Sequence, residues 1–136
     1  MKKISVIIST YNSSKFIRRT IRSVFQQKGF EKDFCIELLL IDDGSDEKEL
    51  LYLEKLVNSI HNTLTKAKSS IRLMRLFHNT GGPNAGRNKG IENATGDLIA
   101  FLDHDDEWTE NKLLTQLKQI ENGYEFVYSP CTKQLG

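Results

Sequence analysis

The sequence of 136 residues has the length of one domain, and a chain of this size can bury roughly two-thirds of the surface that it exposes when unfolded. Hydrophobic residues make up 38% and charged residues 27%, a balance that excludes an intrinsically disordered chain. The formal net charge is +1, so the charge as a whole gives no attraction to nucleic acid, and a polyanionic ligand would need a local site.

The start of the chain and its two cysteines indicate a cytosolic protein or a cytosolic part of one. The apolar run at residues 4–8 is too short for a signal peptide, and polar residues follow it at once. No apolar stretch of the sequence is long enough to span a bilayer. Cys35 and Cys131 form no CxxC pair, so we expect small buried side chains in a reducing compartment.

The first part of the chain alternates buried strands with amphipathic helices. The β-branched run at 4–9 predicts a buried strand, and Ser13 or Ser14 is expected to cap the helix that follows. A second buried strand is predicted at 36–41, and Ser45 or Asp46 is expected to cap a longer helix after it. The inner stripes of the two helices are Ile17, Ile21, Val24 and Phe25, and then Leu50, Leu53, Val57, Ile60 and Leu64.

The second part of the chain continues the same alternation. A weaker strand signal at 71–77 leads to a glycine-rich loop at 78–83, and a helix is predicted from about 84 to 94, where Gly96 stops it. A strong strand is predicted at 98–102. Further expectations are a helix capped by Thr109 and ended by Gly123, and a last strand at 124–129.

Strands that alternate with helices predict an α/β fold with a mostly parallel sheet and helices on both faces. Ligands of such sheets bind beyond the carboxyl ends of the strands. The strong strands of this chain end in polar residues at that edge: Thr10, Tyr11 and Asn12, then Asp42 and Asp43, then Asp103, His104, Asp105 and Asp106.

Carboxylates gathered at one edge repel one another, and a divalent cation is the usual compensation. Asp103 and Asp105 are two residues apart, so in an extended segment their side chains point to the same side. A hard cation such as Mg²⁺ takes one or two carboxylates together with phosphate oxygens and water. The spacing therefore predicts a site for a divalent ion and a diphosphate. His78, which has no partner at ligand spacing, is interpreted as an ordinary residue and not as a ligand, and His104 is interpreted as a surface residue.

Four motifs in order resemble the family 2 glycosyltransferases, which have a Rossmann-like GT-A fold. They are residues 5–12 (SVIISTYN), 41–45 (IDDGS), 79–96 with its NTG, AGRNKG and ATG segments, and 101–106 (FLDHDD, a DxD-type signature). The resemblance covers nearly the whole chain and implies that residues 1–136 are the nucleotide-sugar-binding part of such a transferase.

The resemblance also implies roles for the polar residues. Tyr11 would lie against the nucleotide base, with Thr10 and Asn12 shaping its pocket, and Asp42 or Asp43 would accept the N–H of the base, which favours a UDP-sugar donor. The other nucleotide-sugar-binding residues would be Asn79, Gly81, Arg87 and Asp103. Arg87 has the alternative role of a salt bridge to a nearby aspartate. Asp105, with Asp103, would hold Mn²⁺ or Mg²⁺ as a Lewis acid at the donor phosphates.

The implied reaction is sugar transfer to an acceptor hydroxyl with inversion, the acceptor being a glycan or a lipid-linked molecule, at the cytoplasmic side of a membrane. The family's Glu-Asp motif with the general base does not occur in these 136 residues, so we expect a truncated GT-A domain without it. The later strands of the family would cover one end of the sheet. Their absence predicts an uncovered edge and a homodimer.

Three other functions compete with this one. A non-catalytic module that binds a nucleoside diphosphate would share the donor site and lack turnover. A flavodoxin-like phospho-acceptor domain needs an acidic pair after the first strand, where this chain has Thr10, Tyr11 and Asn12. Dinucleotide binding is set aside because no GxGxxG follows the first strand.

Overall fold

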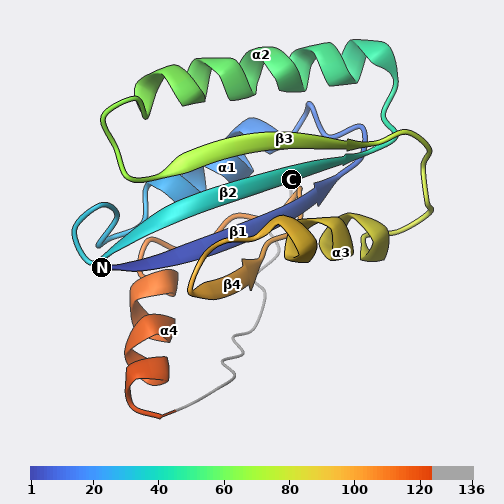
Figure 1. The fold of residues 1–136 in the computed structure, drawn as a ribbon. Coiled ribbons are helices and arrows are strands. Elements are labelled where there is room, and N and C mark those ends of the chain that lie inside the picture. Colours follow the sequence, from blue (N-terminus) through green and yellow to red (C-terminus); the bar gives the residue numbers. More distant parts are fainter. Residues whose placement is uncertain (124–136) are drawn as a thin grey trace.

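The computed structural model describes residues 1–123 as a four-stranded parallel sheet with four helices (Figure 1). The sheet has the strand order β3-β2-β1-β4. The elements are β1 (Lys2–Thr10), α1 (Ile17–Phe25), β2 (Phe34–Asp43), α2 (Glu47–Thr63), β3 (Ser70–Leu76), α3 (Asn84–Asn93), β4 (Leu98–Phe101) and α4 (Lys112–Glu121).

The strand order reverses direction at β1. From β1 the chain moves outward through β2 to β3, and it then returns across the sheet to place β4 on the other side of β1. Such a reversal opens a crevice at the carboxyl ends of the two strands that flank it. The register pairs Thr10 with Asp42 and Ile7 with Phe101, so the ends of β1, β2 and β4 lie close together.

Helices cover both faces of the sheet, as the sequence predicted. One face packs against α1, α2 and α4 in a large core built on alternate residues of the strands, such as Val6 and Leu38. The opposite face carries Ile7, Leu39 and Ile41, and α3 covers it (Figure 1). All ten residues of β2 are buried, which explains why its sequence is apolar on both faces.

Helix α3 lies close to β1 because two glycines face the strand. A Cβ atom at Gly90 would lie 2.5 Å from Ile7 Cγ2, and one at Gly86 would lie 2.8 Å from Ser9 Cβ. Neither distance leaves room for a methyl group. The spacing of four residues places both glycines on one side of the helix, so they set its distance from the sheet.

The helix caps differ from the sequence prediction at two of three positions. Asp46 caps α2 through its side chain, which accepts a hydrogen bond from Glu49 N, as predicted. Helix α1 has Phe16 at its N-cap, and Ser14 donates to Glu49 on α2 instead of capping. Helix α4 begins after Asn111, so Thr109 contributes only its backbone carbonyl, which accepts from Lys112 N. Ser14 thus bonds to a residue of another helix, a partner that local sequence does not show.

The predicted strands and helices otherwise match within two residues, with β3 one residue earlier than expected. The strand predicted at 124–129 lies outside the described residues. Among residues 1–123, no helix combines the length and the apolarity needed to cross a bilayer.

A buried carboxylate fastens the loop before β4 to the sheet. Glu37 of β2 accepts hydrogen bonds from Ser5 Oγ at 2.7 Å and from Thr95 N and Oγ1 at 2.8 and 2.6 Å. Burial by itself raises the pKa of Glu37, but these hydrogen bonds and the charge of Lys3 together hold the pKa below its ordinary value. The ionised carboxylate thus stabilises the connection between α3 and β4.

We expect Glu37→Gln to lower the free energy of unfolding by about 1–3 kcal/mol at neutral pH, because hydrogen bonds to a charged acceptor are lost. The folded pKa is depressed, so the contribution of Glu37 is complete above its unfolded pKa of about 4.3 and is lost as the pH falls through the folded pKa. Urea titrations should therefore show the difference between the two proteins shrinking in acid. The exposed Glu92→Gln serves as the control, and a pH-independent difference would contradict the prediction.

Candidate functional site

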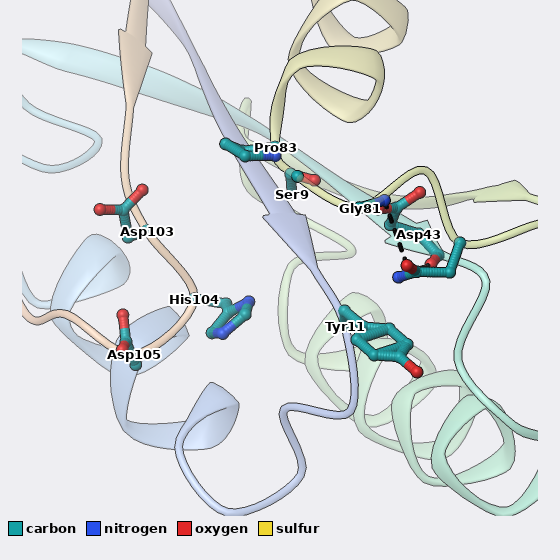
Figure 2. A pocket seen from close by; sticks show the side chains of 10 residues that line it. Ser9, Tyr11, Asp43, Gly81, Pro83, Asp103, His104 and Asp105 are labelled. Carbon is teal, nitrogen blue, oxygen red and sulfur yellow. Dashed lines mark hydrogen bonds between the residues drawn. The ribbon is translucent and has the colours of Figure 1, made fainter.

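A pocket of about 440 Å³ lies at the carboxyl ends of β1, β2 and β4 (Figure 2). Figure 2 shows Asp103 and Asp105 on one side of it, Tyr11 and Asp43 on the other, and His104 between them. The residues that line the pocket are Ser9, Tyr11, Asp43, Asn79, Gly81, Gly82, Pro83, Asp103, His104 and Asp105. It therefore occupies the crevice that the reversal of strand order creates.

The end of β1 supplies an aromatic wall. Tyr11 is 41% exposed, which is high for a residue with a large ring, and it lines the pocket. The residues on either side of it do not line the pocket. Thr10 is buried against Ser13, and Asn12 adopts a positive φ of 46° while its N–H donates to Ser45 Oγ. They hold the turn that presents Tyr11.

The two aspartates at the end of β2 have different surroundings. Asp43 lines the pocket, and its carboxylate accepts hydrogen bonds from Thr80 N and Thr80 Oγ1, the shortest at 2.9 Å. Asp42 is fully buried and lies outside the pocket lining; its Oδ2 accepts from Ser45 N, and its Oδ1 has no hydrogen-bond partner among the described residues. Asp43 is thus the carboxylate that a ligand in the pocket can reach.

The loop between β3 and α3 closes the pocket on the side of Asp43. Asn79 Nδ2 donates to the backbone carbonyl of Asp43 at 3.1 Å, and Asn79 Oδ1 accepts from Gly81 N. Gly44 has a φ of 76°, and a Cβ atom there would lie 2.4 Å from Asn79 N. A side chain at residue 44 would therefore separate the turn after β2 from this loop.

Asp103 is already paired in the structure. Its Oδ1 lies 3.0 Å from Arg87 Nη2, and the Arg87 guanidinium also lies over the Phe101 ring at 5.6 Å. Arg87 does not line the pocket, so its observed contact is the salt bridge to a nearby aspartate that the sequence left open as its alternative role. The ion pair is about half exposed and contributes little to stability, but it fixes the orientation of the Asp103 carboxylate.

Asp105 and Asp103 are both exposed, and both line the pocket. No group of three or more potential metal-ligating side chains occurs within residues 1–123. Two carboxylates fit a Mg²⁺ or Mn²⁺ ion whose remaining ligands are phosphate oxygens and water, and they do not fit a cage made of protein groups alone.

Sequence reasoning missed three lining residues, Ser9, Pro83 and His104, whereas Gly82 was expected beside Gly81 as a position that allows close backbone approach. His104 was interpreted as a surface residue, but it is half-buried and lies between the two sides of the pocket (Figure 2). Its position between two aspartates at the end of a strand was the available signal. For Ser9 the signal was its place two residues before Tyr11, since alternate residues of an extended segment point to the same side.

Comparison with known proteins agrees with the motifs. The model of the family described as "Glycosyl transferase family 2" matches residues 5–134. A Campylobacter jejuni GalNAc(5)-diNAcBac-PP-undecaprenol beta-1,3-glucosyltransferase is 30% identical over 131 residues, which are 96% of this chain and 38% of that protein. The Staphylococcus aureus poly(ribitol-phosphate) beta-N-acetylglucosaminyltransferase TarS is 34% identical over 106 residues, 78% of this chain and 17% of TarS.

Solved structures show the same fold. A structure of S. aureus TarS in complex with UDP superposes with a TM-score of 0.70 at 31% identity, covering 88% of this chain and 32% of that one. A Pyrobaculum calidifontis mannosyltransferase in complex with GDP-Man and Mn²⁺ has the same TM-score at 19% identity, covering 86% and 32%. The fold is thus the Rossmann-like GT-A fold.

The chain spans well under half of the length of these two curated relatives. Within that span the strand ends and the four motifs coincide with one pocket at the carboxyl edge of the sheet. On the family match over residues 5–134, this chain belongs to glycosyltransferase family 2.

Proposed function

We propose that this chain is the donor-binding part of an enzyme that transfers a sugar from a nucleoside diphosphate sugar to an acceptor hydroxyl. The observation that carries the proposal is one pocket that gathers Tyr11, Asp43, Asp103 and Asp105 from three strand ends. An aromatic face and a carboxylate suit a nucleotide base, and a pair of exposed carboxylates suits a diphosphate bound through a cation. Membership of the family supports the same assignment.

The preferred donor is a UDP-sugar. Asp43 has acceptor capacity beyond its bonds to Thr80, because an ionised carboxylate has about four lone-pair sites. A uracil base stacked on Tyr11 can donate its ring N–H to that carboxylate, whereas a base without this donor would leave the acceptor unpaired. Asn79 and Gly81 would complete the pocket from the loop side. The complex of TarS with UDP, a relative 31% identical, supports this choice.

A divalent cation, Mn²⁺ or Mg²⁺, would be held by Asp105 and Asp103 together with the donor phosphates. When bound, such an ion acts as a Lewis acid that stabilises negative charge on a departing diphosphate. The contribution of the chain is positional: Arg87 holds one oxygen of the Asp103 carboxylate through its ion pair, and Asp105 is exposed and lines the pocket.

Transfer would proceed with inversion, the acceptor hydroxyl attacking the anomeric carbon opposite the leaving diphosphate while a carboxylate base takes its proton. We assign no residue of this chain as that base.

The named substrates of the relatives, poly(ribitol-phosphate) and a PP-undecaprenol glycan, favour a glycan or lipid-linked acceptor in polysaccharide synthesis at the cytoplasmic face of a membrane. UDP binding without turnover would identify the alternative, a non-catalytic module.

The outer side of β4 supports the proposed homodimer. Within the described residues β4 pairs with β1 alone, so its other edge has no strand partner among residues 1–123. Ile99 and Phe101 are 44% and 45% exposed on the same face of this strand. An apolar edge of this kind favours pairing with a second copy of the chain.

The metal assignment predicts that UDP binds more tightly when Mn²⁺ is present and that Asp105→Ala removes most of this gain. We expect a loss of at least about tenfold in affinity, or about 1.4 kcal/mol, because a metal-ligating carboxylate is lost. Isothermal titration calorimetry with and without Mn²⁺ measures the affinity of wild type and variant for UDP. Glu92→Ala removes the same charge from the exposed side of α3 and should change nothing. Metal-dependent binding that persists unchanged in Asp105→Ala would remove the role proposed for this residue.

The base assignment predicts that Asp43→Asn weakens UDP binding by roughly 10–100-fold, the cost of losing a hydrogen bond to a charged acceptor. The preference for UDP over CDP should narrow as well, since an amide can donate to the ring nitrogen of cytosine. Competition titrations with the two nucleotides measure both effects. Thr80→Val is the matched control: it removes a bond to Asp43 and leaves the carboxylate, so the UDP preference should survive. An equal preference for UDP over CDP in wild type and Asp43→Asn would exclude Asp43 as the residue that hydrogen-bonds to the base.

The dimer predicts a sedimentation coefficient that rises with protein concentration. Ile99→Lys should shift the chain toward monomer, because a charge on an edge strand opposes pairing. Lys89→Ala, a substitution on α3, is the control and should leave the dependence of the sedimentation coefficient on concentration unchanged. A wild-type chain that stays monomeric at high concentration would exclude the dimer.

A further inference from the structure

Helix α1 and the residue before its first turn carry four cationic side chains on the outer side of the molecule. Lys15, Arg18, Arg19 and Arg22 are all exposed, and no acidic residue occurs between residues 14 and 26. The spacing of three and four residues aligns Lys15, Arg18 and Arg22 along one side of the helix. The opposite side, with Ile17, Ile21 and Val24, is buried in the core. We call the four cationic side chains the basic face.

The basic face borders two shallow hollows that also contain aromatic rings. The first, of about 360 Å³, is lined by all four cations together with Ser14, Phe16 and Tyr52. The second, of about 210 Å³, shares Arg19 and Arg22 with the first and includes Trp108, but Glu107 and Glu110 also line it. The cations and aromatic rings therefore gather without acidic neighbours in the first hollow only.

Most of this positive charge is not neutralised. Arg19 pairs with Glu107 at 3.5 Å, and none of the ion pairs found in residues 1–123 includes Lys15, Arg18 or Arg22. The chain as a whole has a net charge of +1, so the excess on this face is local. Lys15 and Arg18, at the start of the helix, oppose its dipole, whereas Arg22 in the last turn interacts favourably with it, and like charges three or four residues apart repel. Three of the four cations thus do not serve the stability of α1, and binding of an anion explains the basic face better.

We propose that the basic face of α1 binds the surface of a membrane that contains anionic lipids. The cations extend over eight residues, a rise of about 10 Å along a helix, which matches an array of phosphate headgroups better than one small anion. Because the apolar side of α1 is buried, binding is electrostatic and peripheral, with Phe16 and Tyr52 at headgroup level.

The position of the basic face connects this surface to the donor pocket. Thr20 Oγ1 of α1 donates to the backbone carbonyl of His104 at 2.9 Å, and Arg19 pairs with Glu107 in the same loop. A membrane bound along α1 would therefore lie beside the loop that carries Asp103 and Asp105. The inference rests on the proposed function and narrows its acceptor to a lipid-linked molecule presented at that membrane.

Co-sedimentation with vesicles tests the proposal. The chain should bind phosphatidylcholine vesicles that contain phosphatidylglycerol, should not bind pure phosphatidylcholine vesicles, and should dissociate as salt is raised. Arg18→Gln/Arg22→Gln should weaken the partition roughly 25-fold, since each cation near an anionic membrane contributes about fivefold. Circular dichroism confirms that the variant folds. Its calorimetric affinity for UDP and Mn²⁺ should equal that of wild type, which separates this proposal from the donor site.

Lys66→Gln/Lys68→Gln is the matched control, because it removes two exposed lysines from the loop between α2 and β3. An equal loss in both double variants would show unspecific attraction and overturn the assignment to α1. Binding to pure phosphatidylcholine, failure to bind anionic vesicles, or binding to soluble polyphosphate without binding to vesicles would each overturn the membrane as partner.

Discussion

The pairing of β1 with β2 on one side and with β4 on the other is the constraint on which the site depends. All three strands are parallel, so their carboxyl ends meet at one edge. The reversal of strand order at β1 means that no helix crosses over the gap between β1 and β4 at that edge. Residues separated by up to 96 positions in the chain, Ser9 and Asp105 among them, consequently line a single pocket.

Close packing below the pocket keeps these strand ends in register. Gly86 and Gly90 let α3 approach β1, and the Glu37 carboxylate ties the loop between α3 and β4 to both β1 and β2 through Thr95 and Ser5. A shift of β4 along β1 by one residue would turn its side chains to the opposite face. The polar contacts at the amino ends of the strands therefore help to fix the orientation of Asp103 and Asp105 at the other ends.

The sequence predicted the strands and the helices well because their signals are local: apolar runs, helical periodicity and glycine stops. It failed where a tertiary partner competes for a side chain. Ser14 has the chemistry of a cap, but Glu49 on α2 is within its reach and takes the bond. The position of His104 between two aspartates placed it near the site, but how far it enters the pocket depends on how the turn after β4 faces Tyr11. The choice between Asp42 and Asp43 was open for a related reason: β2 is apolar on both faces, so alternation alone does not show which face borders the pocket.

The buried Asp42 explains how the visible pocket is held together. Its Oδ2 accepts a hydrogen bond from Ser45 N at 3.0 Å, and Ser45 Oγ in turn accepts one from Asn12 N at 2.9 Å. This chain of two bonds joins the end of β2 to the turn after β1, directly beside Tyr11. Adjacent residues of a strand point to opposite faces, so the same Asp-Asp pair fixes the turn with one carboxylate and presents the other to a ligand. Tyr11 and the Asp43 carboxylate, which both line the pocket, are thus positioned by a buried residue outside its lining.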